Sequence, residues 1–301
     1  MSYQNITDSI ASKYLGKKVA GSEFYNPSLL VAVPRSDNRT HYSIDNANLP
    51  FLGWDIWHAY EFSTMTENSL PVTRLMKIKY GCNSEYIIES KSLKLYLNSF
   101  NMDRFGNSVE DCLIISKKII ERDLSEKLET DVEVNFLDDS TQRIDLFSEF
   151  IDIMDLADIA TLKIENFKES PELLLSRVED AKKKYYLKFN SLRSNCRVTH
   201  QPDFGDVYIY YNSKLHVDEA SLIKYLVSFR SEYHFHEECC EMIYKRLYDL
   251  LDNEDELFVC ALYTRRGGID ISPVRYSRNC SYNAFESLCD LNTFARAGIK
   301  Q

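Results

Sequence analysis

The sequence predicts an α+β fold made of two similar halves, each with an antiparallel sheet and a helix pair on one face. The first observation is an internal repeat, because residues 92–100 match residues 221–229 at six of nine positions, 129 residues apart. The second is the order of the patterns, since strand-like runs flank a helix pair in each half. We therefore expect two domains, residues 1–150 and residues 151–301.

The first half begins with an irregular stretch. Proline and glycine punctuate residues 1–70, which we interpret as a segment that wraps around the rest of its domain. Residues 92–100 alternate like a strand, but the repeat copy carries its apolar residues on a helical stripe, so we predict helices for both copies. A second helix is predicted from Glu110. The predicted strands lie at 75–80, 85–88 and 131–137.

The second half repeats this order after a joining stretch at 138–184, which is first acidic and then rich in lysine. Helices are predicted at 221–229 and from His236, where Cys240, Ile243 and Leu247 recur at helical spacing. The predicted strands lie at 206–211, 258–264 and 269–276.

Composition excludes several function classes. The 301 residues include 36 Lys and Arg against 46 Asp and Glu, a formal charge of −10, so we expect no nucleic-acid partner. No apolar run approaches the roughly 18 residues of a membrane span, and no secretory signal is evident, so we expect a cytoplasmic protein that binds no membrane. None of the 9 glycines is spaced G-x-G, which excludes the dinucleotide fingerprint and the P-loop.

One cysteine stands in an unusual setting. Cys196 lies in a polar segment with turn residues, whereas Cys260 lies among apolar residues, as buried inert cysteines do. Arg197 beside the thiol would stabilise a thiolate, and Asp203 is close enough in sequence to return near it after a turn. The alternative is that Cys196 is an ordinary structural cysteine.

The densest group of potential metal ligands lies at the start of the helix that begins at His236. It comprises His234, His236, Glu237, Glu238, Cys239 and Cys240. Zinc is one interpretation, but only His236 and Cys240 have helical i, i+4 spacing, and no second Cys/His pair follows at zinc spacing. A helix whose first turn carries favourable acidic residues and whose cysteines pack in the core is the simpler interpretation.

Two further segments carry charge at predicted turns. Residues 89–92 open the first repeat helix and resemble a capping sequence. Residues 265–268, Arg-Arg-Gly-Gly, join two predicted strands. A hairpin turn explains the glycines but not the arginines, which together with Lys91 would suit a ligand that carries phosphate.

Taken together, these segments resemble one family, the NADPH-dependent 7-cyano-7-deazaguanine reductases of the queuosine pathway in their long two-module form. The resemblance extends over nearly the whole chain. It rests on residues 15–17, 25–30, 34–35, 55–57, 60–61, 89–96, 194–196, 201–203, 235–237 and 265–270.

The resemblance implies a fold and a chemistry. The fold is the tunnelling fold, present twice per chain, in subunits that form a homodimer, and the second module carries the nucleophile. Cys196 is implied to form a covalent thioimidate with the nitrile, and Asp203 to supply protons. Two NADPH molecules per substrate would deliver two hydrides, and no metal is required.

The resemblance also implies the binding residues. A carboxylate suits the paired N–H donors of a guanine-like edge, so Glu89 and Glu237 are expected to contact the substrate. The implied substrate-binding set is Ile88, Glu89, Ser90, Phe235, His236 and Glu237. The implied cofactor-binding set is Ser90, Lys91, Arg266 and Gly267.

Two alternatives stay open at this point. One is another enzyme of the same fold that acts on a pterin or purine and uses zinc held by His236 and Cys240. The other is a module that binds a heterocycle without turning it over, although the pair of Cys196 and Asp203 argues against that function.

Overall fold

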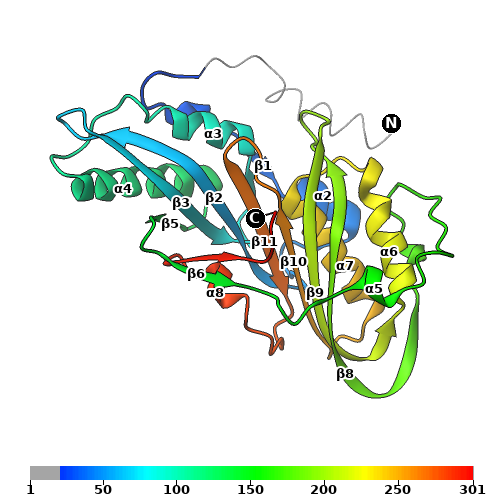
Figure 1. The fold of residues 1–301 in the computed structure, drawn as a ribbon. Helices are drawn as coiled ribbons and strands as arrows, with labels where there is room; N and C mark the ends of the chain where they lie inside the picture. The colour runs from blue at the N-terminus through cyan, green and yellow to red at the C-terminus, as the bar shows by residue number, and fades with distance from the viewer. Residues whose placement is uncertain (1–20, 301) are drawn as a thin grey trace, which may run out of the picture.

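The computed structural model describes residues 21–300, and the α+β class predicted from the sequence is confirmed. Its centre is one eight-stranded sheet with the order β5-β3-β2-β11-β10-β9-β8-β7 (Figure 1). All neighbouring strands pair antiparallel except β7 and β8, which are parallel. The strands are β2 (Leu52–Met65), β3 (Pro71–Gly81), β5 (Val132–Leu137), β7 (Ile151–Asp152), β8 (Ser176–Asn195), β9 (Pro202–Val217), β10 (Glu256–Tyr263) and β11 (Ile269–Tyr276).

Short elements surround this sheet. Strands β1 (Ala32–Pro34) and β4 (Tyr86–Ile88) form an antiparallel pair, and β6 (Gln142–Asp145) and β12 (Thr293–Arg296) form a parallel pair. The short helices are α2 (Ser36–Arg39), α5 (Ile153–Leu156), α8 (Glu286–Cys289), η1 (Pro27–Leu29), η2 (Thr40–Tyr42), η3 (Pro171–Leu173) and η4 (Ser228–Ser231). No helix within residues 21–300 is long and apolar enough to cross a membrane.

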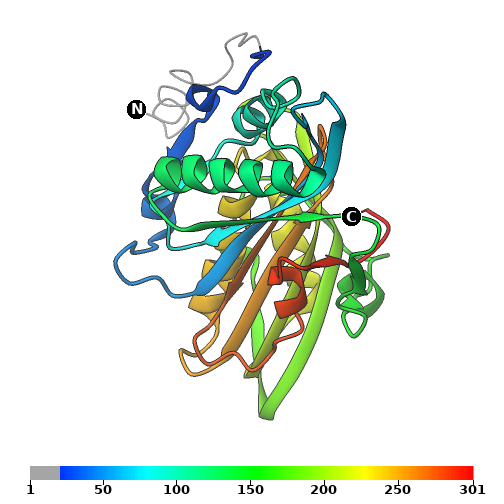
Figure 2. The same cartoon turned by 90° about the vertical axis from the view of Figure 1, so that its left-hand side faces the viewer.

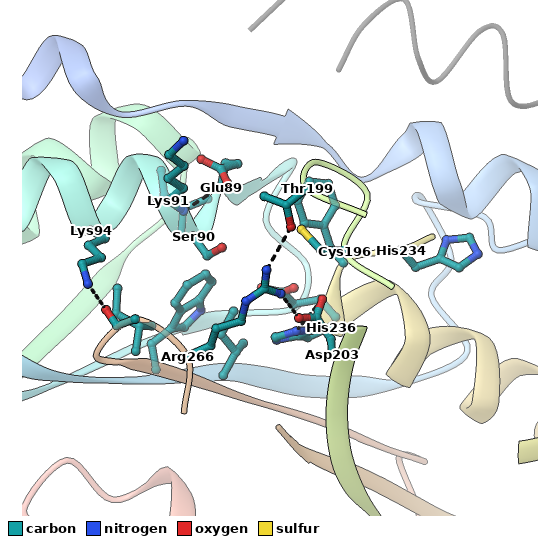
Figure 3. A pocket seen from close by; sticks show the side chains of 17 residues that line it. Glu89, Ser90, Lys91, Lys94, Cys196, Thr199, Asp203, His234, His236 and Arg266 are labelled. Carbon is teal, nitrogen blue, oxygen red and sulfur yellow. Dashed lines mark hydrogen bonds and ion pairs between the residues drawn. The ribbon is translucent and has the colours of Figure 1, made fainter. Parts of the chain in front are cut away.

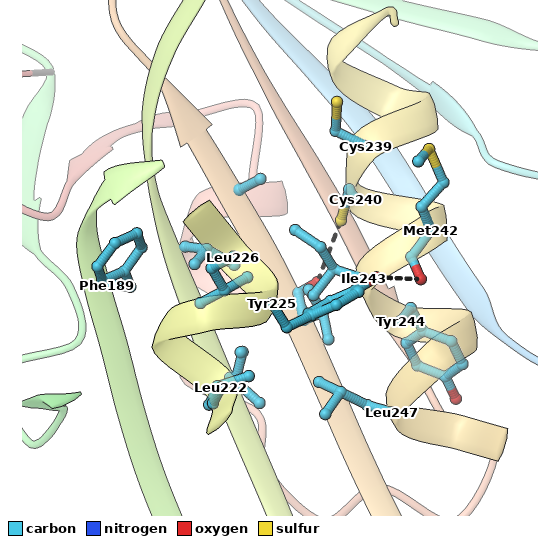
Figure 4. Close-up of a cluster of buried hydrophobic side chains, with 14 of the residues drawn as sticks. Phe189, Leu222, Tyr225, Leu226, Cys239, Cys240, Met242, Ile243, Tyr244 and Leu247 are labelled. Carbon is cyan, nitrogen blue, oxygen red and sulfur yellow. Dashed lines mark hydrogen bonds between the residues drawn. The ribbon is translucent and has the colours of Figure 1, made fainter. Parts of the chain in front are cut away.

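The two predicted helix pairs are present. Helices α3 (Ser90–Asn98) and α4 (Val109–Leu128) pack on the strands of the first half, and Figure 2 shows α4 lying across them. Helices α6 (Glu219–Val227) and α7 (His236–Leu250) pack on the second half. Figure 4 shows side chains of α6 and α7 meeting in the core between these helices and the strands. Both pairs lie on the same face of the sheet, as the repeat predicts.

The sheet is buried on its other face as well. Aromatic residues of the strands, among them Tyr208, Tyr210 and Phe258, pack there against Phe147 and Tyr282. The Nζ atom of Lys77 in β3 donates hydrogen bonds to the carbonyls of Asp290 (2.7 Å) and Thr293 (3.0 Å), which fastens the C-terminal segment to this face. Side chains on alternate positions of one strand therefore belong to two different cores.

Strands β2 and β11 join the halves, with Ala59 opposite Ile269 and Leu52 opposite Tyr276. Behind this junction lies a buried network of charged side chains. Glu241 of α7 pairs with Arg39 (2.7 Å) and Arg275 (2.9 Å), and Asp55 of β2 pairs with Arg35 (2.5 Å) and Arg275 (2.8 Å). Because each charge has an opposite partner, the start of α7 is held against β2 although all five groups are buried.

Two predictions about irregular segments are wrong. Residues 1–70 contain the 14-residue strand β2. Its residues 55–59 are buried on both faces of the sheet, so apolar and polar residues do not alternate there and the sequence does not indicate a strand. The lysine-rich end of 138–184 is the first part of β8, not a linker. Its exposed lysines suit a strand that is an edge of the sheet for most of its length. The motif at 15–17 lies outside the described residues.

Candidate active site

A cavity of about 220 Å³ lies on the helix face of the sheet, at the junction of the two halves (Figure 3). All residues predicted for the site line it, so the structure brings together segments up to 179 positions apart, from Ile88 to Gly267. The predicted residues are Ile88, Glu89, Ser90, Lys91, Cys196, Asp203, Phe235, His236, Glu237, Arg266 and Gly267. The cavity is also lined by residues outside the predicted substrate, cofactor and catalytic sets, namely Trp57, Lys94, Thr199, His234, Ile269 and Ile271.

Cys196 follows the last residue of β8, in a tight turn before β9. Its backbone N–H donates to the carbonyl of Gln201 (2.8 Å), and its own carbonyl accepts from the N–H of His200 (2.9 Å). His200 takes the left-handed conformation that closes the turn (φ 56°). The thiol is free and half-buried, whereas burial raises the pKa of Cys239 in the core to about 12. Accessibility therefore separates Cys196 from the core cysteines.

Asp203 stands on β9 between the side chains of Arg266 and His236. Its Oδ1 accepts a hydrogen bond from Arg266, and its Oδ2 lies 3.4 Å from Nε2 of His236. Burial favours the neutral carboxyl, but the hydrogen bond to His236 and the charge of Arg266 outweigh burial, so the pKa of Asp203 lies below its ordinary value. The ring of His236 is stacked on Tyr263 with centroids 3.7 Å apart, which fixes its direction toward Asp203.

Arg266 connects the β10–β11 hairpin to the turn that carries Cys196. The hairpin closes between Arg266 and Ile269, and Gly267 and Gly268 supply the positive φ values of 60° and 83° that the turn requires. Besides Asp203, the guanidinium donates to Oγ1 of Thr199 (2.9 Å). Arg266, which a hairpin turn alone did not explain, thus links the β10–β11 hairpin to the β8–β9 turn by hydrogen bonds.

The two predicted glutamates differ in their partners. Glu89 caps α3, where its two carboxylate oxygens accept from the backbone N–H groups of Lys91 (3.0 Å) and Ser92 (2.6 Å). Burial raises the pKa of Glu89, although these N–H groups act in the opposite direction. Glu237 is buried in the first turn of α7, and its Oε1 has no hydrogen-bond partner among the described residues. Burial and the neighbouring carboxylate of Asp55 raise the pKa of Glu237 to about 8.

Lysines of α3 lie along one side of the cavity. Lys91 and Lys94 both line it, and Nζ of Lys94 donates to the carbonyl of Gly267 on the β10–β11 hairpin. Ser90, in the first turn of α3, lines the cavity as well. A helix start with two lysines and Arg266 nearby is suited to bind a ligand that carries phosphate.

The remaining members of the acidic and cysteine-rich group have structural partners. Cys239 and Cys240 are buried in the core, as the packing interpretation predicts. Sγ of Cys240 faces the carbonyls of Val259 and Pro273, so His236 and Cys240 do not converge on the cavity. Within residues 21–300, no group of three or more His, Cys, Asp and Glu is arranged to hold a metal ion.

Arg197 was expected to support the thiol. Its Nη1 forms an ion pair with Oε1 of Glu238 (3.0 Å), and its guanidinium lies 5.4 Å from the ring centroid of Phe235. Glu238 in turn accepts from the N–H of Phe235 (2.9 Å). Arg197 therefore steadies the start of α7, where three of the predicted substrate-binding residues stand.

Comparison with known proteins gives two family matches and several relatives. Residues 22–136 match the model "Nitrile reductase, 7-cyano-7-deazaguanine-reductase N-term", and residues 202–281 match "QueF-like protein". Three relatives are each named NADPH-dependent 7-cyano-7-deazaguanine reductase. The chain is 39% identical to the one from Colwellia psychrerythraea, over 91% of this chain and 94% of the relative. It is 38% identical to those from Buchnera aphidicola (85% and 94%) and Coxiella burnetii (87% and 90%).

Proposed function

The chain belongs to the NADPH-dependent 7-cyano-7-deazaguanine reductases, and from this premise we propose how its cavity reduces a nitrile. The enzyme converts the nitrile of 7-cyano-7-deazaguanine to an aminomethyl group with NADPH, a step in queuosine biosynthesis. One observation carries the residue assignment: the same cavity is lined by the half-buried thiol of Cys196, the ionised carboxylate of Asp203 and the unpartnered Oε1 of Glu237.

In the first step, Cys196 adds to the nitrile carbon. The new C–S bond replaces one π bond of the nitrile, and the nitrogen takes a proton, which gives a covalent thioimidate. Asp203 is suited to relay this proton because its lowered pKa keeps it ionised before the reaction. It receives the thiol proton of Cys196 and passes it to the nitrogen, so no proton from bulk water is needed.

The reduction then requires two hydrides and two protons per nitrile. NADPH, when bound, supplies the hydrides, and we propose two NADPH per substrate. Asp203 takes up one proton from solvent for each reduction and delivers it to the nitrogen. Between the two reductions the C–S bond breaks and a C=N bond forms, and the leaving sulfur takes a proton from the nitrogen, which returns Cys196 to its thiol form. The thiol activates the carbon itself, so the proposed reaction uses no metal.

The substrate-binding residues are proposed to surround the deazaguanine ring. Glu237 accepts from its N–H and amino groups, because its Oε1 is buried and otherwise unpaired. Phe235 covers the ring, and His236 stands beside Asp203 near the reacting carbon. Ile88, Glu89 and Ser90 contact it from the first half.

The cofactor-binding residues are proposed to be Ser90, Lys91, Arg266 and Gly267. They fit NADPH because the amino end of α3, two lysines and the Arg-Gly turn lie at one side of the cavity. This arrangement provides positive charge for phosphate without a glycine-rich loop.

We further propose that residues 1–150 and 151–301 are two modules of the tunnelling fold. The matching order of strands and helix pairs in the two halves supports this division. The subunits are proposed to form homodimers in the cytoplasm, with a small molecule and no nucleic acid as the ligand.

The decisive experiment is mass spectrometry of the protein mixed with 7-cyano-7-deazaguanine without NADPH. We expect an adduct of the substrate mass on the peptide that contains Cys196. Cys196→Ala should lose both the adduct and NADPH oxidation. Cys280→Ala is the matched control, since Cys280 is also free and half-buried, and it should retain both.

Stoichiometry provides the second readout. Wild-type enzyme should oxidise close to two NADPH for each amine formed. Full turnover by Cys196→Ala would overturn the nucleophile assignment. Substrate binding without NADPH oxidation by the wild type would identify a binding module instead of an enzyme.

A further inference from the structure

Residues that line the cavity carry four buried polar atoms without a hydrogen-bond partner among the described residues: Nε1 of Trp57, Nδ1 of His234, Nδ1 of His236 and Oε1 of Glu237. Of these, Nδ1 of His234 still has an ion-pair partner, Oε2 of Glu238, at 3.4 Å. Buried donors and acceptors are nearly always paired in folded proteins, and an unpaired one costs free energy. At a ligand site such atoms mark the contacts that the ligand completes. His236 and Glu237 already have proposed functions, whereas the indole N–H of Trp57 has none.

The side chain of Trp57 is held rigidly. It is only 1% exposed and lies on β2, opposite Ile78 of β3 and Ile271 of β11. Its apolar body belongs to the core beneath α3. Phenylalanine would fill such an apolar position without burying a donor, so packing alone does not account for the indole nitrogen.

The other tryptophan of the chain provides an internal comparison. Trp54 lies on the same strand but on the opposite face of the sheet, half-buried, with Nζ of Lys79 4.8 Å from its ring centroid. Burial raises the pKa of the Tyr276 hydroxyl, and the indole of Trp54 acts against this effect, so a polar group is near the indole. The tryptophan of β2 on the opposite face therefore has a polar neighbour, whereas Nε1 of the one that lines the cavity has no partner among the described residues.

We propose that Trp57 is a specificity-determining residue whose Nε1–H donates a hydrogen bond to the ring carbonyl oxygen of the substrate. The inference rests on the proposed function. A deazaguanine presents its carbonyl oxygen next to the ring N–H, so a donor and an acceptor from the protein are needed side by side. Among the described residues that line the cavity, Trp57 supplies an unpaired N–H donor and Glu237 an unpaired carboxylate acceptor. An adenine-type edge, with an amino group beside an acceptor nitrogen, would leave both unpaired and be rejected.

The test compares two ligands on two proteins. Binding is measured by calorimetry in the Cys196→Ala background, so that no covalent adduct forms. The ligands are 7-cyano-7-deazaguanine and its 6-thio analogue, which keeps the ring N–H and amino group but carries sulfur, a poor acceptor. Adding Trp57→Phe should weaken binding of the oxygen ligand about 5- to 100-fold and of the thio ligand less than about twofold.

Each other outcome overturns the proposal. An equal loss for both ligands would mean that the indole only packs or pairs with another atom, and no loss for either would mean that it makes no contact. Trp54→Phe is the matched control and should leave both dissociation constants unchanged. Adduct formation on Cys196 in the otherwise wild-type enzyme tests the proposed function separately, so the two failures are distinguishable.

A folding defect must be separated from lost recognition, because Trp57 is part of the core. Thermal unfolding of each variant measures this directly. If Trp57→Phe does not fold, replacing Trp57 by β-(3-benzothienyl)alanine exchanges the N–H for sulfur and keeps the shape of the ring. That variant should show the same selective loss of affinity for the oxygen ligand. If it bound the oxygen ligand as tightly as the Cys196→Ala protein does, the proposal would be overturned.

Discussion

The four long helices begin in two different ways. The starts of α4 and α6 take no part in lining the cavity, and their capping residues are Ser108 and Asp218. Each accepts a hydrogen bond from the backbone N–H three residues further on, at 3.1 and 2.8 Å. This is the usual side-chain cap of a helix.

The starts of α3 and α7 line the cavity and depart from that pattern. Glu89, which the repeat aligns with Asp218, caps α3 with a longer side chain whose carboxylate lines the cavity. Phe235 precedes α7 and offers no polar side chain, so Glu238 accepts from its N–H instead. The usual capping residues are replaced where the cavity has a carboxylate or an aromatic ring. In each helix pair, one helix start has therefore been specialised for the cavity: that of α3 in the first half and that of α7 in the second.

The largest expected effect distinguishes a residue proposed for proton transfer from a residue proposed for cofactor binding. Asp203→Asn, in the second half, should lower kcat by roughly 10²- to 10⁴-fold because proton transfer is lost. Lys91→Ala, in the first half, should raise KM for NADPH and change kcat less. Steady-state kinetics with both substrates checks this. A similar fall of kcat in both variants would contradict a division of tasks between the halves.

The two glutamates of the cavity provide the next test. Glu237→Gln should weaken substrate binding by about 10- to 100-fold, because an amide accepts only part of what the carboxylate accepts and adds a misplaced donor. Glu89→Gln should weaken it less, since the Glu89 oxygens already accept from the helix. Calorimetry in the Cys196→Ala background measures both, and a reversed order would refute the comparison.

The pH dependence should separate Glu237 from Asp203. The pKa of Glu237 is raised to about 8, so its contribution to folding stability is fully present below its unfolded pKa and is lost as pH rises toward 8. The pKa of Asp203 is lowered, so its contribution is present at neutral pH and lost in acid. Glu237→Gln should flatten the decline in unfolding free energy between pH 4.5 and about 8 without changing the loss at lower pH that Asp203 causes, as measured by denaturant titrations across pH.

Substrate binding should also change the protonation of Glu237. Because the ligand donors favour the carboxylate, binding at pH 7 should release up to one proton. Calorimetry in buffers of different ionisation enthalpy measures this release. It should be absent in Glu237→Gln, and an unchanged release in that variant would assign the proton to another group.

The smallest effect concerns the aligned caps. Glu89→Ala and Asp218→Ala should each lower the free energy of unfolding by about 1 kcal/mol, since each leaves helix N–H groups without a cap. Only Glu89→Ala should also weaken substrate binding. Asp218→Ala is thus the matched control for stability, and an effect of Asp218→Ala on affinity would mean that the caps are not specialised.

Much of the fold was predictable because periodicity and repetition are local properties of the chain. The repeat at 92–100 and 221–229 predicted α3 and α6, although the first copy alternates like a strand. Strand β2 was missed because a strand buried on both faces loses its alternation. The lysine-rich part of β8 was missed because its charges are those of an exposed edge, which also resemble a linker.

The sequence by itself determined the residue types of the site and, through motif resemblance, the family. Only the tertiary structure decided which of those residues have partners. Glu89 and Glu237 look equivalent in the sequence, yet one caps a helix and the other has an unpaired buried oxygen. From the sequence, Trp57 is expected to be a core residue, and only the structure shows that it also lines the cavity. The physical reason is that a hydrogen-bond partner is a matter of distance in space, and the partners here come from strands and turns far apart in the chain.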